Sequence, residues 1–370
     1  MKKIIRAAAL GGAVALALAA CGSAPEETET PGSSGSAAAP VDFTACMVSD
    51  EGGFDDASFN QSGYEGLKKA ESDLGIQVKT AESTDPGQYT TNVDSMVQAN
   101  CDLIIGVGFA LEDAIQAAAD ANKDKHFALV DSAFSDADFN PVTLENAKPL
   151  LFNTQEAAYL AGYLSAGMSK THTLATFGGQ PFPSVTIFMD GFVDGAAAYA
   201  KDSGTATKVL GWDKAKQNGS MIGNFSDTQA GADTSTQFIE DGADVILPVA
   251  GPVGSGTLNA ASQHDGTMVV WVDSDGYLQP SNEQYKSLIL TSVMKQIGTA
   301  VFDTIKASVD GNFTAEPYVG TLENGGVDIA PFHDFESQVP AELSSKIDEL
   351  REQIISGDLV VDSPSANKVS

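Results

Sequence analysis

The chain has 370 residues and 42% hydrophobic side chains, which is enough for two domains with separate cores. Fifty acidic residues against twenty basic ones give a formal charge of −30, so nucleic acid and anionic lipid surfaces are excluded as expected partners. Four histidines and three cysteines provide few ligands for a transition-metal site. We expect no metal and no cofactor.

The first twenty residues have the charge order of a secretory signal peptide. Three basic residues precede an apolar run at residues 7–20 that is too short for a permanent membrane span. The run ends in Leu-Ala-Ala before Cys21, which resembles a lipobox, the motif at which bacterial signal peptidase cuts before a cysteine that is then lipidated. We expect residues 1–20 to be removed, taking the formal charge from −30 to −33, and Cys21 to carry a palmitate-type anchor.

Residues 21–40 are expected to be the lipidated cysteine and a flexible tether, because no large apolar side chain follows Cys21 in this segment. The mature chain would then lie on the extracytoplasmic face of the cell membrane. In that oxidising setting, Cys46 and Cys101 are either a disulfide or two buried thiols, since they fall on strands expected to be neighbours.

A first series of alternating strands and helices follows the tether. The predicted strands are residues 43–48, 76–80, 103–107 and 127–130. The predicted helices are residues 64–74, a segment starting at 85, and residues 111–122. This alternation predicts a parallel sheet with helices on both faces.

A second series begins near residue 153. Its predicted helices are residues 157–168, 185–199, segments starting near 227, 255 and 293, and residues 343–355. Its predicted strands are residues 173–177, 207–211, 220–225, 245–249, 268–272, 288–291 and a strand-like end at 359–361. Two such units predict an α/β fold of two doubly wound lobes joined by a hinge. We expect residues 41–152 with about 293–312 in the first lobe, and residues 153–292 with about 313–362 in the second.

Candidate binding residues come directly after the predicted strands, because open parallel sheets bind ligands at the carboxyl ends of their strands. The densest stretch is residues 52–66, where paired glycines precede an aromatic residue, acids and an amide. The candidates are Asp50, Phe54, Asp55, Asn60, Phe109 and Asp131 from the first series, and Phe225, Gly251, Asp273 and Lys295 from the second.

These residue types favour a flat, polar, uncharged ligand. Phe54 and Phe225 offer faces for a base ring, and carboxylates accept hydrogen bonds from neighbouring hydroxyls of a sugar. The alternative is that the strand-end acids are helix caps or solvated loop residues and that Phe54 and Phe59 belong to the core. We expect Asp56 to be such a cap.

Motifs for nucleotide, calcium and hydrolytic chemistry are missing from the sequence. It contains no Gly-x-x-x-x-Gly-Lys-Ser/Thr, no complete Gly-x-Gly-x-x-Gly, no EF-hand loop and no nucleophile elbow around a serine. We therefore expect a binding protein and not an enzyme.

Several segments, in order along the chain, resemble the basic membrane protein family, the purine nucleoside receptor type of ABC-transporter substrate-binding lipoprotein. They are GFDD and SFN within residues 53–60, AYLAG at 158–162, GADVI at 242–246, VDSD at 272–275 and TSVMK at 291–295. The resemblance covers about residues 43–361. It implies a type I periplasmic-binding fold, a monomer that binds a nucleoside in the cleft, and ABC permease and ATPase partners.

The resemblance also implies roles for individual residues. Phe54 and Phe225 would stack on the base, while Asp55 and Asn60 would read its edge. Asp273 and Lys295 would hold the ribose, with Asp131 contributing from the first lobe. The chain departs from the family at Gly276, where glutamine is common, and Trp212 is a reserve candidate for the second stacking residue.

Other functions remain open at this point. The ligand of the same kind of receptor could be a sugar, a short amide or a thiamine-like cation. The cleft carboxylates could instead serve a nucleoside hydrolase, and the fold could be the scaffold of a surface adhesin or sensor.

Overall fold

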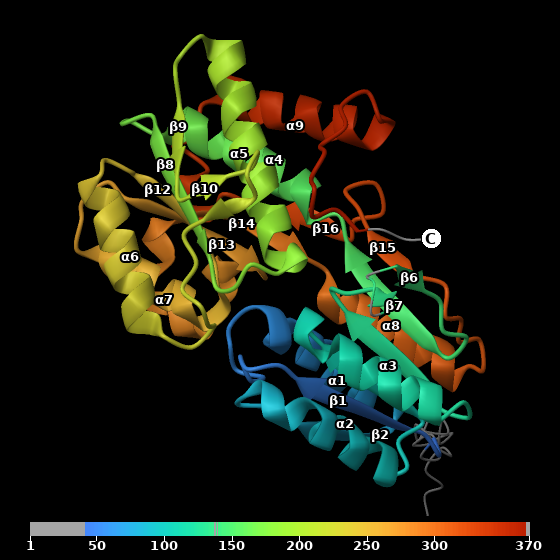
Figure 1. Cartoon of the computed structure of the whole chain (residues 1–370). Coiled ribbons are helices and arrows are strands. Elements are labelled where there is room, and N and C mark those ends of the chain that lie inside the picture. Colours follow the sequence, from blue (N-terminus) through green and yellow to red (C-terminus); the bar gives the residue numbers. More distant parts are fainter. Residues whose placement is uncertain (1–40, 137, 139, 368–370) are drawn as a thin grey trace, which may run out of the picture. The chain divides into compact units, whose positions relative to one another are not determined.

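Two six-stranded sheets form the core of the molecule (Figure 1). The computed structural model describes residues 41–136, 138 and 140–367. The expected signal peptide, Cys21 and the whole of the expected tether lie outside these residues. We call each sheet with the helices that pack on it a lobe.

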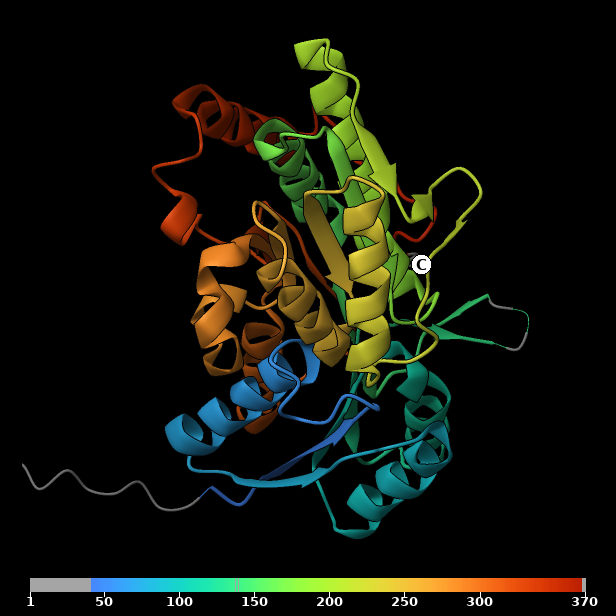
Figure 2. The ribbon, with the colours of Figure 1, turned by 90° about the vertical axis from the view of Figure 1, so that its left-hand side faces the viewer.

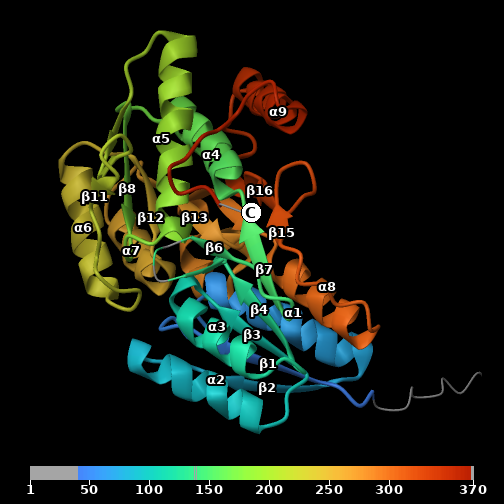
Figure 3. The same ribbon diagram turned by 45° about the vertical axis from the view of Figure 1, so that its right-hand side comes forward.

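The first sheet is entirely parallel, with the order β15-β7-β4-β3-β1-β2. Its strands are β1 (Thr44–Ser49), β2 (Gln77–Ala81), β3 (Leu103–Val107), β4 (His126–Val130), β7 (Ala147–Phe152) and β15 (Tyr318–Gly320). Its helices are α1 (Phe59–Leu74), α2 (Tyr89–Gln98), α3 (Glu112–Ala121) and α8 (Ile297–Val309). Helices α1 and α8 pack together on one face, and α2 and α3 cover the other (Figures 1 and 3).

Close packing of α1 on α8 depends on glycine. A Cβ atom added to Gly66 would lie 2.3 Å from the carbonyl oxygen of Gly298, closer than any side chain tolerates. This contact explains why the glycine-rich stretch 52–66 extends into the helix. It also holds α8, which comes late in the sequence, on the first lobe.

The second sheet has the order β16-β14-β13-β12-β8-β9, and only the pairing of β16 with β14 is antiparallel. Its strands are β8 (Thr173–Gly178), β9 (Lys208–Leu210), β12 (Val245–Val249), β13 (Met268–Asp273), β14 (Ile289–Lys295) and β16 (Val327–Ile329). Its helices are α4 (Thr154–Met168), α5 (Pro183–Ser203), α6 (Thr228–Glu240), α7 (Gly254–Ser262) and α9 (Ala341–Ser356). Helices α4 and α5 pack together, as do α6 and α7, and α9 contacts α4 (Figure 2).

Small hairpins and 3-10 turns connect these elements. The hairpin strands are β5 (Phe134–Ser135) with β6 (Pro141–Val142), and β10 (Trp212–Asp213) with β11 (Asn218–Gly219). The 3-10 turns are η1 (Pro86–Gln88), η2 (Phe109–Leu111), η3 (Gly251–Val253), η4 (Gly276–Leu278), η5 (Pro280–Leu288) and η6 (His333–Phe335). In the part of the chain that is described, no helix combines the length and apolar character needed to span a membrane.

The two-sheet α/β fold predicted from the sequence is confirmed, with differences at particular strands. Strand β14 continues in the second sheet to Lys295, beyond the expected crossing near residue 293, because residues 293–295 keep pairing with β13 or β16. Strand β15 pairs with β7 in the first sheet, although we expected residues after 313 in the second. With three residues, it is too short to leave a periodic signal.

Two other strand predictions are wrong. Residues 220–225 form only an isolated bridge between Gly178 and Met221 before a loop. Residues 359–361 form no strand; Val361 is buried, whereas Val360 is 78% exposed. Apolar composition alone therefore predicted strands in two segments whose side chains pack on the core without strand pairing along their length.

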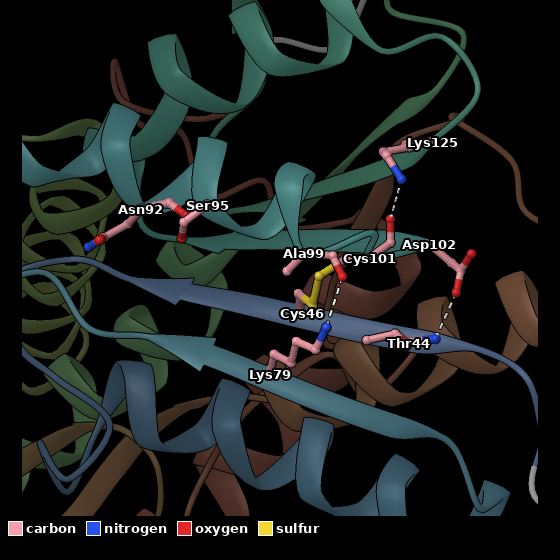
Figure 4. Close-up of a disulfide and its surroundings, with 9 residues drawn as sticks. All are labelled: Thr44, Cys46, Lys79, Asn92, Ser95, Ala99, Cys101, Asp102 and Lys125. Carbon is pink, nitrogen blue, oxygen red and sulfur yellow. Dashed lines mark hydrogen bonds between the residues drawn. A yellow bond between two sulfur atoms is a disulfide. The ribbon is translucent and has the colours of Figure 1, made fainter.

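A disulfide joins Cys46 in β1 to Cys101 just before β3 (Figure 4). The two strands are direct neighbours, with Cys46 opposite Ile104, and the Cα atoms of the two cysteines are 5.9 Å apart. Both residues are fully buried in the core beneath α2 and α3.

We expect the double substitution Cys46→Ala/Cys101→Ala to lower the free energy of unfolding by about 2–4 kcal/mol, because it reopens a loop of 55 residues in the unfolded chain. Urea denaturation of the variant, and of the parent chain with and without reductant, measures this effect. Equal midpoints in all three samples would show that the bridge contributes nothing.

Candidate ligand-binding site

A pocket lies at the carboxyl ends of strands from both sheets. The space between its lining atoms is about 530 Å³, a figure that includes space open to solvent. The residues that line it are Asp50, Gly52, Asp56, Phe59, Asn60, Gly108, Phe109, Asp131, Phe182, Ser184, Val185, Phe188, Phe225, Val249, Ala250, Gly251, Pro252, Asp273 and Lys295.

A buried ion triad forms the charged part of the pocket. Lys295 ends β14, and its ammonium pairs with Asp131 of the first lobe and lies 3.0 Å from Asp273 Oδ1 of the second. All three side chains are more than nine-tenths buried. Burial alone would lower the pKa of Lys295, but the two carboxylates outweigh it and raise this pKa, so the ammonium stays charged.

Both carboxylates of the triad sit on unusual backbone. Asp131 follows β4 with φ of 63°, and Asp273 ends β13 with φ of 67°. This left-handed conformation is uncommon for residues other than glycine and recurs at functional sites. The left-handed conformation ends the extended chain at both positions, and both side chains line the pocket.

A second polar group lies on the first lobe. The Asn60 amide donates to Asp50 Oδ1 at 2.7 Å and to Asp56 Oδ2 at 3.2 Å. Asn60 is 1% exposed, yet its own Oδ1 has no hydrogen-bond partner among the described residues. A buried acceptor without a donor favours a ligand that brings an N–H or O–H group.

Asp50 is expected to make the stability of the ligand-free protein depend on pH. Burial raises its pKa to about 7, against the hydrogen bonds from Asn60 and Gly52 that lower it. Since an unfolded aspartate has a pKa of about 3.9, the folded chain holds this proton more tightly. The stabilising contribution is complete below about pH 4 and is lost as the pH rises to about 7.

Urea denaturation between about pH 5 and pH 7 checks this prediction. The unfolding free energy of the parent should fall relative to that of Asp50→Asn by on the order of 1 kcal/mol per pH unit. Parallel curves for the two proteins would mean that Asp50 titrates alike in the folded and unfolded chains.

Aromatic rings line the apolar part of the pocket. Phe109 and Phe182 stack with centroids 5.2 Å apart, and Phe225 lies 6.0 Å from Phe182. The Phe225 ring packs on the backbone of Gly179, where an added Cβ atom would come within 2.3 Å of it. Lys295 lies 4.8 Å from the ring centroid of Phe59.

Eight of the ten predicted binding residues line this pocket. They are Asp50, Asn60, Phe109, Asp131, Phe225, Gly251, Asp273 and Lys295. The other two, Phe54 and Asp55, do not. Phe54 is 8% exposed and packs in the core, with its ring stacked on Tyr64 at 5.0 Å, and Asp55 is exposed. Both residues precede Ala57, whose φ of 55° turns the chain before α1 begins at Phe59.

Four further side chains line the pocket although they were not among the predicted binding residues. Asp56 does cap α1, accepting from the backbone N–H groups of residues 58, 60 and 61, but it also lines the pocket. Phe59 lies five residues after Phe54 in the same stretch and is the first residue of α1. Phe182 and Phe188 follow the strand-end glycines 178 and 179, so the strand-end rule could have found Phe182.

The two remaining expectations about the site concern Trp212 and Gly276. Trp212 does not line the pocket; its indole donates to the buried carboxylate of Asp190 at 2.8 Å. At Gly276 an added Cβ atom would lie 2.4 Å from the indole of Trp271, so this ring takes the space of a longer side chain. Among the residues that the structure describes, no three His, Cys, Asp or Glu side chains are grouped to hold a metal ion.

Solved structures with the same fold include solute-binding proteins of ABC transporters and transcription regulators. One from Aeropyrum pernix matches with a TM-score of 0.76 at 21% identity, covering 86% of this chain and 94% of its own. Another from Conexibacter woesei matches with a TM-score of 0.65 at 19% identity, covering 87% and 99%. The chain therefore has the two-lobed α/β fold of periplasmic binding proteins.

Sequence comparison assigns the family. Residues 43–364 match the family described as ABC transporter substrate-binding protein PnrA-like. The chain is 30% identical to the ABC transporter nucleoside-binding protein BmpA of Lactococcus lactis, over 98% of this chain and 99% of the relative. It is also 30% identical to basic membrane protein A of Borreliella burgdorferi, over 85% and 86%. The chain therefore belongs to the PnrA-like, or basic membrane protein, family of ABC-transporter substrate-binding proteins.

Proposed function

We propose that this protein binds a nucleoside, with purines favoured, in the pocket between its two lobes. The observation that carries the proposal is the Asp131–Lys295–Asp273 triad, buried in a pocket that five phenylalanines line. Aromatic faces suit a base, and carboxylates with an ammonium between them suit the vicinal hydroxyls of ribose. The name of the Lactococcus lactis relative supports the same ligand class.

The charge of the pocket favours a nucleoside over a nucleotide. Lys295 is the one lysine or arginine among the described lining residues, and two carboxylates already pair with it. A phosphate group would meet the carboxylates of Asp131 and Asp273, whose positive partner Lys295 is already paired. A neutral ligand avoids this cost.

The acidic lining also favours a second candidate, a thiamine-like cation. A panel of thermal-shift measurements separates the possibilities, because a ligand that binds only the folded chain raises its melting temperature. Inosine, guanosine and adenosine should raise it, while inosine monophosphate and free ribose should not. A shift with thiamine or a sugar alone would replace the nucleoside by that ligand.

In this proposal the protein binds its ligand without transforming it. Incubation with inosine, followed by chromatography for free hypoxanthine, tests this directly. We expect inosine to be recovered unchanged. Hypoxanthine produced in proportion to protein concentration would instead identify a hydrolase.

We further propose that the mature chain is a monomer anchored through Cys21 to the outer face of the cell membrane, where it delivers ligand to an ABC permease and its ATPase. The family supplies the transporter partner, and the lipobox-like sequence before Cys21 supports the anchor. Fractionation of cells that express the parent or Cys21→Ala tests the anchor. The substitution should move the protein from the membrane fraction to the soluble fraction.

A further inference from the structure

Residues 57 and 58 of the first lobe reach into the second lobe. The carbonyl oxygen of Ala57 accepts hydrogen bonds from the Trp271 indole at 3.3 Å and from the Ser274 hydroxyl at 3.0 Å. The Ala57 side chain packs in an apolar cluster with Leu258 and Trp271 of the second lobe. This turn therefore joins the two lobes without a chain crossing.

Ser58 has a hydroxyl group that its own helix does not use. It occupies the N-cap position of α1, where a serine usually accepts from the first backbone N–H groups, but it makes no such bond. The Asp56 carboxylate accepts from those groups instead, at 2.9 Å from Asn60 N and 3.0 Å from Gln61 N. The Ser58 hydroxyl is thus free to donate elsewhere.

The Ser58 hydroxyl donates across the lobe boundary to Asp273 Oδ2 at 2.8 Å. The other oxygen of this carboxylate, Oδ1, faces Lys295 at 3.0 Å and accepts no hydrogen bond from the described residues. Ser58 is fully buried and does not line the pocket. One oxygen of Asp273 is therefore held by Ser58, and the other is paired with Lys295 in the pocket.

We propose that Ser58 is a positioning residue, which orients Asp273 for the ligand through this hydrogen bond from the opposite lobe. The proposal rests on the proposed function in that Asp273 contacts the ligand. It adds that the second-lobe part of the site is complete only while the turn at residues 57–58 is docked. Opening of the lobes at this turn would release the Asp273 carboxylate and the bound ligand together.

Ser58→Ala tests the proposal, with Ser72→Ala as the matched control, since Ser72 is an exposed serine of the same helix. Circular dichroism first establishes that both variants are folded. A crystal structure of ligand-free Ser58→Ala should show the Asp273 carboxylate rotated out of its contact with Lys295, whereas Ser72→Ala should keep the parental arrangement. An unchanged Asp273 in Ser58→Ala would overturn the proposal.

Inosine titration supplies the functional readout. Ser58→Ala should bind inosine roughly tenfold more weakly than the parent, because a hydrogen bond to a charged group is lost, and Ser72→Ala should bind it as the parent does. Equal affinity of Ser58→Ala and the parent would overturn the positioning role. If the parent itself binds no inosine, the nucleoside assignment fails, and the orientation of Asp273 in the two crystal structures still decides the role of Ser58.

Discussion

Lys295→Met is expected to abolish ligand binding and to lower the free energy of unfolding by about 3–5 kcal/mol. The substitution leaves Asp131 and Asp273 facing each other in a buried site without a compensating cation. Urea denaturation measures the loss of stability, and calorimetric titration with inosine measures the loss of binding.

A lysine outside the triad serves as the matched control. Lys306 pairs with Asp310 on the exposed surface of α8, so Lys306→Met should change stability by less than about 1 kcal/mol and leave binding intact. Adding Asp131→Asn to Lys295→Met should restore part of the stability, since one uncompensated charge is removed, but not the binding. Parental stability in Lys295→Met alone would contradict a buried ion triad.

The phenylalanines should divide into residues that bind ligand and residues that support the fold. Phe225→Ala and Phe59→Ala should each weaken nucleoside binding by about 1–3 kcal/mol, the usual contribution of stacking between a base and an aromatic ring. Phe54→Ala should leave affinity nearly unchanged but cost about 3 kcal/mol or more of stability, because it opens a cavity beside Tyr64.

Titration and denaturation of the three variants under the same conditions check this division. Loss of affinity in Phe54→Ala with stability retained would place Phe54 at the ligand. If Phe225→Ala and Phe59→Ala both bound the nucleoside as tightly as the parent, stacking of the base on these two rings would be ruled out.

The sequence predicts the second-lobe part of the site well, because its residues lie at strand ends. Asp273 and Lys295 are the last residues of β13 and β14, and Gly251 follows β12 closely. In a parallel sheet these ends share one edge, so position along the strand is enough to bring the side chains together. The same rule places Asp131 correctly in the first lobe.

The first-lobe loop is predicted less well, because its direction depends on one backbone angle. Ala57 adopts a left-handed conformation, which is rare for alanine. The neighbouring residues contain no signal that predicts it. Phe59 and Asp56 line the pocket, and the expected Phe54 and Asp55 do not. Residues in such conformations are held by the surrounding structure, and here Trp271 and Ser274 donate hydrogen bonds to the carbonyl oxygen of Ala57.

Aromatic residues from α5 were missed for a different reason. Phe188 lies within a helix with apolar residues on most sides, where hydrophobic periodicity does not distinguish a ligand-facing ring from a core ring. Only the packing of α5 against the second sheet brings Phe188 to Lys295, at 4.8 Å from its ammonium.

Calorimetric titration of the mature chain with inosine tests the nucleoside assignment most directly, with free ribose and inosine monophosphate as comparison ligands. The account predicts saturable binding of inosine at one site per chain, no measurable binding of the monophosphate, and much weaker or no binding of ribose. Saturable binding of ribose with no response to inosine or guanosine would contradict it.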